Sequence, residues 1–242
     1  MNQLGKRIAV LIVGILVVLL GRGAFYHSGF YKAPPAEMPS YEHIVSPLAP
    51  STEYRDAYEK AEGTILLDLA HDNAVDVEEI DVLLSRLISR KLTIEFFSGN
   101  DLEEELSEVN GFIVVCPQVE FSKEERETIS TFVNNEGKLL LIADPTRSGE
   151  MNSLSLKFGL IFEPDYLYNL KENDANFRNI FVTEFKENEI TKELEKIALY
   201  TAGSITSADC GIASVDENTS SSVIKTRKGL SPMALANESG VL

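Results

Sequence analysis

The feature that most constrains the fold is an alternation of short apolar runs with amphipathic segments between Gly63 and Arg147. Four apolar runs have strand length: residues 64–68, 92–97, 111–115 and 138–143. Residues 77–90 and 124–135 instead carry apolar side chains at helical spacing. Nearly continuous apolar strands joined by helices are typical of parallel sheets that are buried on both faces. The pattern predicts an open, doubly wound α/β domain with a mostly parallel sheet.

Local signals support the two predicted helices. Asp76 is followed three residues later by Glu79, and Ser122 is followed three residues later by Glu125, which is the spacing of an N-terminal cap. Gly137 follows the second helix and predicts its end.

Beyond Arg147 the pattern loosens. We expect a helix over 151–158, short strands over 160–162 and 179–185, a small helix with apolar positions at 190, 194 and 197, and strands over 198–205 and 222–226. The last three residues, 240–242, resemble the start of a strand. We therefore expect either a very short final strand or a polypeptide that continues beyond residue 242.

The amino terminus carries a second strong signal. Residues 8–20 are apolar or glycine without a charge, preceded by Lys6 and Arg7 and followed by Arg22. A cleaved secretory signal requires a small-residue cleavage site after such a run, and none is evident. We favour an uncleaved, single-pass anchor over residues 8–26, with a cleaved signal as the alternative. The positive-inside rule then predicts a cytoplasmic N-terminus and an extracytoplasmic C-terminal domain at the cell membrane.

Proline composition separates this anchor from the domain. Five of the nine prolines fall between Lys32 and Ser51, and such a segment behaves as a stiff, extended spacer. The sequence thus predicts three parts: an anchor or signal over 1–31, a spacer and lead-in over 32–62, and an α/β domain over 63–242 whose core is 63–147.

The charge distribution excludes one class of partner. The chain has 22 Lys and Arg against 38 Asp and Glu. Four of the bases precede the first acid, Glu37, so the remainder carries 18 bases against 38 acids. A domain this acidic repels a polyanion, and we expect no nucleic-acid binding.

Polar residues follow all four predicted strands at the edge of the sheet where ligands usually bind. In an open α/β sheet this edge is formed by the carboxyl ends of the strands. The candidate ligand-binding residues in these loops are Asp68, His71, Asn73, Asn100, Cys116, Asp144 and Arg147. His71 is the best single candidate for a polar role. The alternative is structural, because Asp and Asn commonly cap helices and turns, and Arg147 can simply pair with Asp144 or another acid.

The sequence supports neither a metal site nor a cofactor. The other two histidines, His27 and His43, lie in the predicted anchor and spacer, so His71 has too few partners for zinc. No dinucleotide-binding or P-loop glycine motif occurs at a strand-to-helix turn. We expect the membrane, a protein and a small ligand as the partners.

Cys116 has three interpretations. A catalytic cysteine requires a base within hydrogen-bond reach and usually a tight turn with small neighbours, which residues 115–118 lack. We favour a buried, inert thiol and expect no catalytic residue. A disulfide with Cys210 is chemically permitted outside the cytoplasm.

Residues 63–147 resemble a known family. The similar features are the loop over 69–73, the strand and turn over 111–117, the helix over 124–135 and the segment over 136–147. They resemble the flavodoxin-like fold of class I glutamine amidotransferases, in the branch with the DUF4350 proteins, the GldG-type auxiliary components of ABC transport systems, and the IFT52-type domain. The enzymes of this fold use a cysteine on a sharp turn with a histidine and an acid, but the loop over 144–150 has no cysteine. The resemblance therefore implies a noncatalytic member that is tethered to a membrane and recognises a partner or ligand.

The expected function is that of a membrane-anchored, extracytoplasmic, noncatalytic accessory or binding component of a membrane complex, such as an ABC-type transporter. One alternative is a diverged amidotransferase-like hydrolase that uses His71, Cys116 and Asp144. Another is a module that binds carbohydrate or a surface polymer.

Overall fold

The computed structural model describes residues 3–28, 32, 60–147, 149–207, 210–223 and 229–236. The chain divides into two compact units, residues 1–56 and 57–242. Most of the predicted spacer, most of the predicted strand over 222–226, and the predicted strand start over 240–242 lie outside the described residues.

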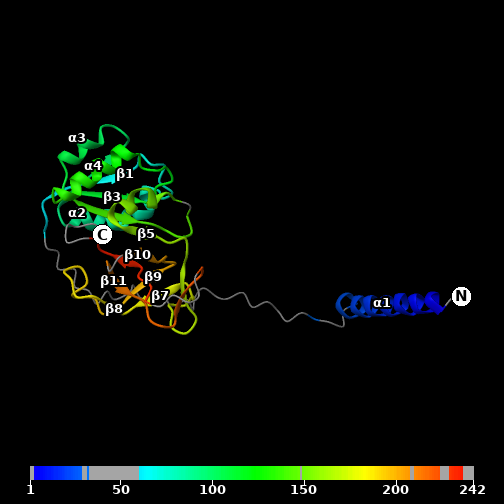
Figure 1. Ribbon diagram of the computed structural model, residues 1–242. Coiled ribbons are helices and arrows are strands. Elements are labelled where there is room, and N and C mark those ends of the chain that lie inside the picture. The colour runs from blue at the N-terminus through cyan, green and yellow to red at the C-terminus, as the bar shows by residue number, and fades with distance from the viewer. Residues whose placement is uncertain are drawn as a thin grey trace. The chain divides into compact units, whose positions relative to one another are not determined.

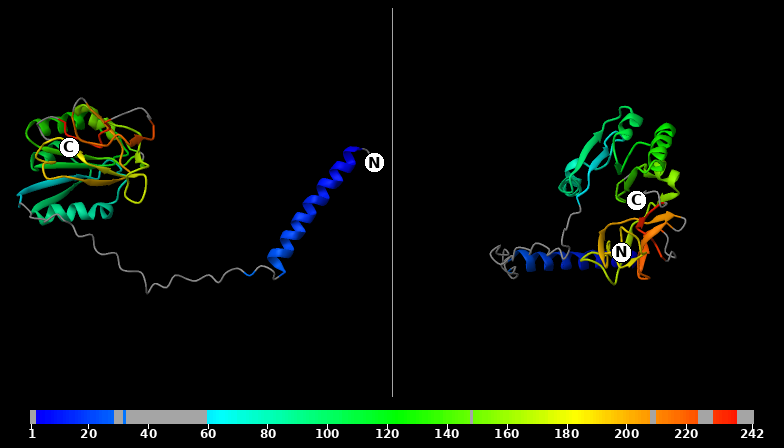
Figure 2. Two further views of the ribbon diagram at one scale, coloured as in Figure 1. Left: turned by 90° about the horizontal axis from the view of Figure 1, so that it is seen from below. Right: turned by 90° about the vertical axis from the view of Figure 1, so that its left-hand side faces the viewer.

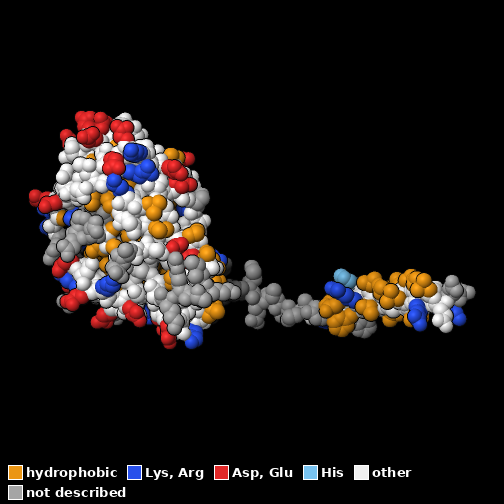
Figure 3. Space-filling view, in the orientation of Figure 1, with side chains coloured by type: hydrophobic (Ala, Val, Ile, Leu, Met, Phe, Trp, Pro, Cys, Tyr) orange, Lys and Arg blue, Asp and Glu red, His pale blue; other side chains and the backbone are white. Residues whose placement is uncertain are grey.

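The first unit contains one continuous helix, α1, over Gln3–His27 (Figure 1 and Figure 2). Its most apolar window has a mean hydropathy of 2.6, and none of its side chains is buried within the protein. At 1.5 Å per residue the helix is about 37 Å long, whereas the hydrocarbon core of a bilayer is about 30 Å thick. Hydrophobic side chains cover α1 and basic side chains lie near both of its ends (Figure 3). The helix is therefore long and apolar enough to span a membrane, and it contains the predicted anchor.

The second unit is built on a parallel sheet. The strands are β1 (Gly63–Asp68), β2 (Leu92–Phe97), β3 (Gly111–Val115) and β4 (Lys138–Ile142), in the order β2-β1-β3-β4. All three neighbouring pairs are parallel. The chain first adds a strand on one side of β1 and then adds strands on its other side, so the strand order reverses beside β1. The predicted doubly wound α/β fold is confirmed.

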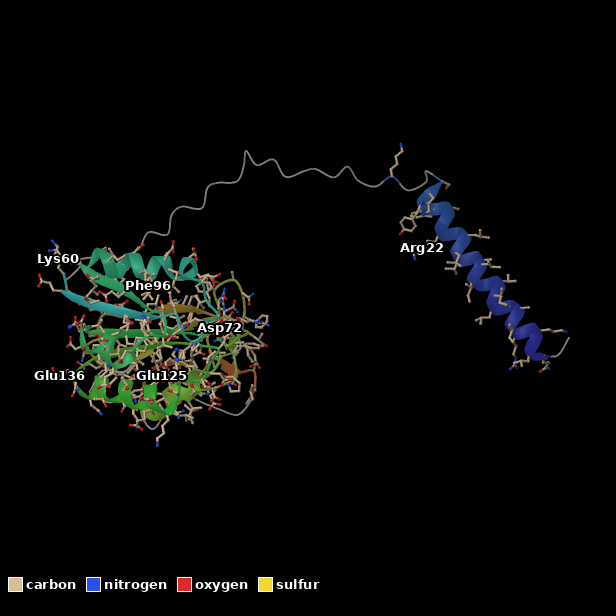
Figure 4. The ribbon with its side chains drawn as sticks, turned by 90° about the horizontal axis from the view of Figure 1, so that it is seen from above. Arg22, Lys60, Asp72, Phe96, Glu125 and Glu136 are labelled. Carbon is tan, nitrogen blue, oxygen red and sulfur yellow. The ribbon has the colours of Figure 1, made fainter. Side chains whose placement is uncertain are left out.

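Helices cover both faces of this sheet (Figure 4). The 3-10 helix η2 (Val77–Ile80) and α2 (Asp81–Ser89) pack on one face, against Leu67, Ile113 and Val115. The helices α3 (Leu102–Ser107) and α4 (Lys123–Asn134) pack on the other face, against Phe112 and Val114. Both predicted capping boxes are present.

Helix α3 was not predicted. It has only six residues, and its buried side chains are Leu102 and Leu106. Asp101 caps it by accepting hydrogen bonds from the N–H groups of Glu103 and Glu104, at 3.1 and 3.2 Å.

The rest of the unit, coloured yellow-green to red in Figure 2, has a helix followed by short strands. Every pair of these strands is antiparallel. The elements are α5 (Met151–Ser155), η3 (Leu156–Phe158), β5 (Leu160–Phe162), β6 (Leu167–Asn169), β7 (Asn179–Val182), β8 (Glu184–Phe185), β9 (Ile197–Tyr200), β10 (Ile205–Ser207), β11 (Gly211–Ser214), β12 (Thr219–Ser221) and β13 (Met233–Ala234). They pair as β5 with β10, β6 with β12, β7 with β9, and β11 with both β8 and β13. We call residues 60–147 the parallel half and residues 149–236 the antiparallel half.

Two predictions for the antiparallel half are wrong in detail. Residues 189–193 form turns instead of a helix, because Asn188 accepts a hydrogen bond from the N–H of Ile190 at 2.7 Å and Thr191 binds the carbonyl of Lys186. The predicted strand over 198–205 is interrupted at Thr201, which has a φ of 57°. Strand β12 (Thr219–Ser221) was not predicted, and only residues 222 and 223 of the strand predicted over 222–226 are described.

Candidate functional site

Three of the predicted site residues meet at the end of β1. Asp68 is 1% exposed, and its carboxylate accepts hydrogen bonds from the N–H of Ala70 at 3.2 Å and from Asn73 Nδ2 at 3.2 Å. His71 Nδ1 lies 2.8 Å from Asp68 Oδ1. A carboxylate only accepts hydrogen bonds, so Nδ1 donates this one. The loop after β1 is thus organised around one buried carboxylate.

His71 lies between two acidic side chains. Its Nε2 is 3.4 Å from Glu125 Oε1 on α4, and its ring stacks on Phe121 with the centroids 3.7 Å apart. Burial alone would lower the pKa of His71, but the hydrogen bond to Asp68 and the charges of Asp68 and Glu125 outweigh it and raise this pKa. Burial also opposes ionisation of Glu125, yet the bonds from Ser122 and the nearby His71 lower its pKa overall. The geometry favours a protonated imidazole that links Asp68 at the end of β1 to Glu125 on α4.

Asn73 ties the same loop to β3. Its Nδ2 donates to the carbonyl of Val115 at 2.8 Å, in addition to Asp68. Its Oδ1 is buried and has no hydrogen-bond partner among the residues that the structure describes.

Cys116 occupies the turn that follows β3. Its N–H donates to the carbonyl of Ile142 at 2.9 Å, and its carbonyl accepts from the N–H of Ala74 at 2.9 Å. The residue is 4% exposed and has a φ of 45°, a left-handed conformation that few non-glycine residues adopt. Burial raises the pKa of the thiol, although the N–H of Asp144 partly offsets this effect. Cys116 and Cys210 are not joined by a disulfide, so the disulfide alternative is wrong.

Asp144 and Arg147 form a second cluster at the end of β4. Asp144 Oδ1 accepts hydrogen bonds from the N–H and the hydroxyl of Thr146, at 2.8 and 2.6 Å. Arg147 makes a two-pronged ion pair with Glu79, at 2.6 and 3.0 Å, donates to the carbonyl of Ala74, and has its Nε 3.4 Å from Asp144. The hydrogen bond from Arg147 lowers the pKa of Glu79 to about 2, and the same pairing raises the pKa of Arg147.

Asn100 stands apart from both clusters. It lies before α3, and its Nδ2 is 3.5 Å from Glu105 Oε1. The structure therefore brings together six of the seven predicted residues, in two clusters that Cys116 and Ala74 connect.

A cleft of about 870 Å³ opens beside the second cluster. Cys116, Asp144 and Arg147 line it from the parallel half, while the antiparallel half supplies most of the remaining wall, including Glu150, Phe162, Glu163, Tyr200, Thr201 and Met233. Its volume is in the range of small-molecule sites. The sequence did not point to the wall residues of the antiparallel half, because only tertiary pairing of short strands brings them here.

Most polar groups of these two clusters already form hydrogen bonds or ion pairs with neighbouring side chains of the protein. The guanidinium of Arg147, the imidazole of His71 and the carboxylate of Asp68 each bind neighbouring side chains. Among the residues that the structure describes, no three His, Cys, Asp or Glu side chains are placed to hold a metal ion.

Comparison with known proteins supports the fold alone. No protein-family model and no curated protein matches the chain. Among solved structures, the mmIFT52 N-terminal domain superposes with a TM-score of 0.56 and 16% identity, over 64% of this chain and 74% of that one. A ThuA-like protein from Bacteroides uniformis ATCC 8492 has a TM-score of 0.42 and 14% identity, over 69% of this chain and 71% of that one. The IFT52 domain is thus similar in fold, at a sequence identity that carries no function with it.

Proposed function

We propose that the protein is a membrane-anchored, extracytoplasmic, noncatalytic α/β protein that acts as an accessory, partner-binding component of a membrane complex. The observation that carries the proposal is α1, a 25-residue apolar helix with no side chain buried within the protein. A helix of this kind is suited to lipid, because its side chains are apolar and its backbone groups bond within the helix along the span.

The noncatalytic part of the proposal is supported by the state of the polar groups. A reactive cysteine requires a lowered thiol pKa, whereas burial raises the pKa of Cys116. His71 donates to Asp68 and faces Glu125, so its ring nitrogens are occupied by carboxylates. The best explanation of both clusters is that they hold the loops after β1, β3 and β4 together.

The sequence resemblance suggests the kind of membrane complex to which the protein belongs. The GldG-type proteins of the resembling branch are auxiliary components of ABC transport and gliding systems, and this chain resembles that branch in residues 63–147. We extend the proposal to an auxiliary role beside an ABC-type transporter.

Orientation in the membrane follows the basic residues. Lys6 and Arg7 precede the apolar run on a very short tail, and the acidic domain follows it. The positive-inside rule therefore favours a cytoplasmic N-terminus and an extracytoplasmic domain.

The experiment uses two matched cysteine variants in a full-length background that carries Cys210→Ser. Glu187→Cys places a thiol on the exposed surface of the domain, and Gln3→Cys places one at the start of α1. A membrane-impermeant maleimide is expected to label Glu187→Cys in intact cells, and Gln3→Cys only after lysis. The chain should sediment with membranes with α1 intact. Recovery of a soluble chain that has lost its first 28 or so residues, or labelling of Gln3→Cys in intact cells, would contradict the proposal.

A second candidate function is a diverged hydrolase that uses His71, Cys116 and Asp144. The observation in its favour is the left-handed backbone of Cys116 at the edge of the 870 Å³ cleft, because strained residues often lie at functional sites. The carbohydrate-binding alternative stays a prediction, and glycan binding to the full chain tests it.

A further inference from the structure

Strand β2 is an edge of the parallel sheet. It pairs with β1 along its whole length, from Gly63 opposite Leu92 to Asp68 opposite Phe97. No strand among the described residues pairs with its other side. The unpaired N–H and C=O groups of an edge strand are a template for another chain, and proteins usually protect such edges. The outer side of β2 is therefore an unpaired edge within the described part of the chain.

The face of the sheet that carries α3 is strongly acidic next to this edge. A groove of about 800 Å³ runs between β2 and α3, and its wall contains Ile94, Glu95, Phe96, Asn100, Asp101, Glu104, Glu105 and Glu108. No lysine or arginine lines it. Within the described part of the chain, Glu95, Glu104 and Glu108 form no ion pair with a basic side chain. Figure 3 shows acidic side chains gathered over α3.

The opposite face of the same edge is apolar. Side chains alternate between the two faces of a strand, so Ile94 and Phe96 lie on the face that α2 covers while Glu95 lies on the α3 face. Phe96 is 46% exposed, and Ile94 is partly buried against the α2 side of the core. Figure 4 shows Phe96 on the α2 side of the sheet. A strand added beside β2 would therefore face an apolar surface on one side and carboxylates on the other.

We propose that β2 and α3 form a docking groove for an extended segment of a partner protein, which adds beside β2 and carries Lys or Arg at alternate positions with apolar residues between them. The proposal rests on the proposed function and names the chemistry of its partner. The bases would face Glu95, Glu104 and Glu108, and the apolar side chains would cover Phe96. Backbone pairing of this kind supplies affinity, and the alternate side chains supply specificity.

Charge decides against a second copy of this chain as the occupant. Pairing β2 with β2 of another molecule would bring two copies of Glu95 and of the α3 acids together. Like charges placed opposite each other in a sheet are destabilising. A partner segment with Lys or Arg would instead neutralise the carboxylates of the groove.

The test uses the full-length protein in phosphatidylcholine nanodiscs, which carry no net lipid charge. Two fluorescein-labelled eight-residue peptides have the same composition: one alternates lysine and valine, and the other has four lysines followed by four valines. We expect the alternating peptide to bind at least about tenfold more tightly by fluorescence anisotropy, and to slow hydrogen exchange at residues 92–97. Empty nanodiscs serve as the control for lipid binding.

Matched variants locate the site. The triple variant E95K, E104K and E108K is expected to bind the alternating peptide about tenfold or more weakly, because it reverses the charge of the groove. The control triple variant, E187K, E193K and E195K, makes the same change of net charge on exposed residues of the antiparallel half and should keep most of the binding. Phe96→Thr tests the apolar face without changing charge, and should also weaken binding. Unchanged circular dichroism of each variant checks that it folds.

Three results would overturn the proposal: equal binding of the two peptides, equal loss in the two triple variants, or exchange protection only outside residues 92–97. Concentration-dependent dimerisation with protection of β2 in the absence of peptide would also overturn it, in favour of a second copy. None of these results changes the cysteine-labelling pattern expected for the proposed function. Failure of the docking proposal can therefore be distinguished from failure of the proposed function.

Discussion

The two halves of the α/β unit reach an ordered structure by different means. The parallel half uses strands of five or six residues, and Phe112 and Val114 at its centre have no exposed surface. The antiparallel half uses strands of two to four residues. Its own core cluster is smaller and contains Leu167, Ile180, Val182, Ala213, Val215 and Leu230. Its other buried apolar residues include Met151, Leu154, Leu160, Ala234 and Ala236, which pack into the core of the parallel half.

Buried polar side chains connect segments of the antiparallel half through hydrogen bonds. Asp165 is 3% exposed and accepts hydrogen bonds from the N–H and hydroxyl of Ser204, at 2.8 and 2.9 Å, and from the hydroxyl of Ser221. Asn169 bonds to Asp216 and Thr219 in a similar way. Strands this short bury little apolar surface, so these bonds specify which segments pair. The parallel half thus relies mainly on apolar burial, whereas the antiparallel half combines apolar burial with a larger set of buried polar contacts.

The largest expected effect comes from the core of the parallel half. Phe112→Ala removes a fully buried ring between the sheet and the helices α3 and α4. We expect the free energy of unfolding to fall by about 4 kcal/mol, measured by urea denaturation of the full chain. Val82→Ala, at a side chain that is 63% exposed, should cause little change. A loss below about 1 kcal/mol for Phe112→Ala would refute the role assigned to apolar burial.

The next effect tests the polar contacts. Asp165→Ala leaves Ser204 and Ser221 without their buried acceptor, and we expect a loss of about 3 kcal/mol. Hydrogen exchange should accelerate in β6, β10 and β12 while β1 and β3 stay protected. Asp165→Asn keeps one acceptor oxygen and should lose less. Uniform acceleration across both halves would show that the two halves do not differ in this respect.

A third prediction concerns pH and the parallel half. The folded-state pKa of His71 is raised above its ordinary value of 6.5, so the folded state binds the proton more tightly than the unfolded state does. The resulting stabilisation is fully present below about pH 6.5 and is lost as the pH rises through the raised value. The stability difference between the native chain and His71→Gln should therefore shrink from pH 5.5 to 8.5. A difference that does not change over this range would contradict the ion pairing of His71 with Asp68 and Glu125.

The smallest expected effect is at the exposed ion pair of Arg147 and Glu79. Arg147→Ala removes contacts that lie in solvent, so global stability should change little, and less still at high salt. Hydrogen exchange in residues 144–147 should nevertheless increase, because Arg147 connects this loop to Ala74 and Glu79. A loss of stability as large as that of Asp165→Ala would contradict this prediction, because it would show that the contacts of Arg147 stabilise the whole domain.

The parallel half could be predicted from the sequence because each of its strands is an apolar run with a local signal at its end. The bounds predicted for β2 and β3 are the observed ones, and the capping residues Ser122 and Glu125 locate the start of α4. Helix α3 could not be predicted from periodicity, since its six residues include only one pair of apolar side chains, Leu102 and Leu106. The available signal was its cap at Asp101.

The candidate site could be predicted only in part. The loops after the strands contain most of its residues, but their partners are remote: His71 meets Glu125 on α4, and Arg147 meets Glu79 across 68 positions of sequence. The wall of the cleft depends on Glu163 and Tyr200, which short strands place there. A local sequence pattern does not predict contacts between residues that lie this far apart in the sequence.

The central claim is that the polar residues at the carboxyl edge of the sheet hold the loops together and perform no covalent chemistry. The most direct measurement is the rate of iodoacetamide labelling of Cys116 in the folded full-length chain with Cys210→Ser, relative to the denatured chain. Burial and a raised thiol pKa predict strong protection in the folded state at neutral pH. Rapid labelling, with an apparent pKa well below that of a free thiol, would contradict the claim and identify the cleft as the active site of a hydrolase.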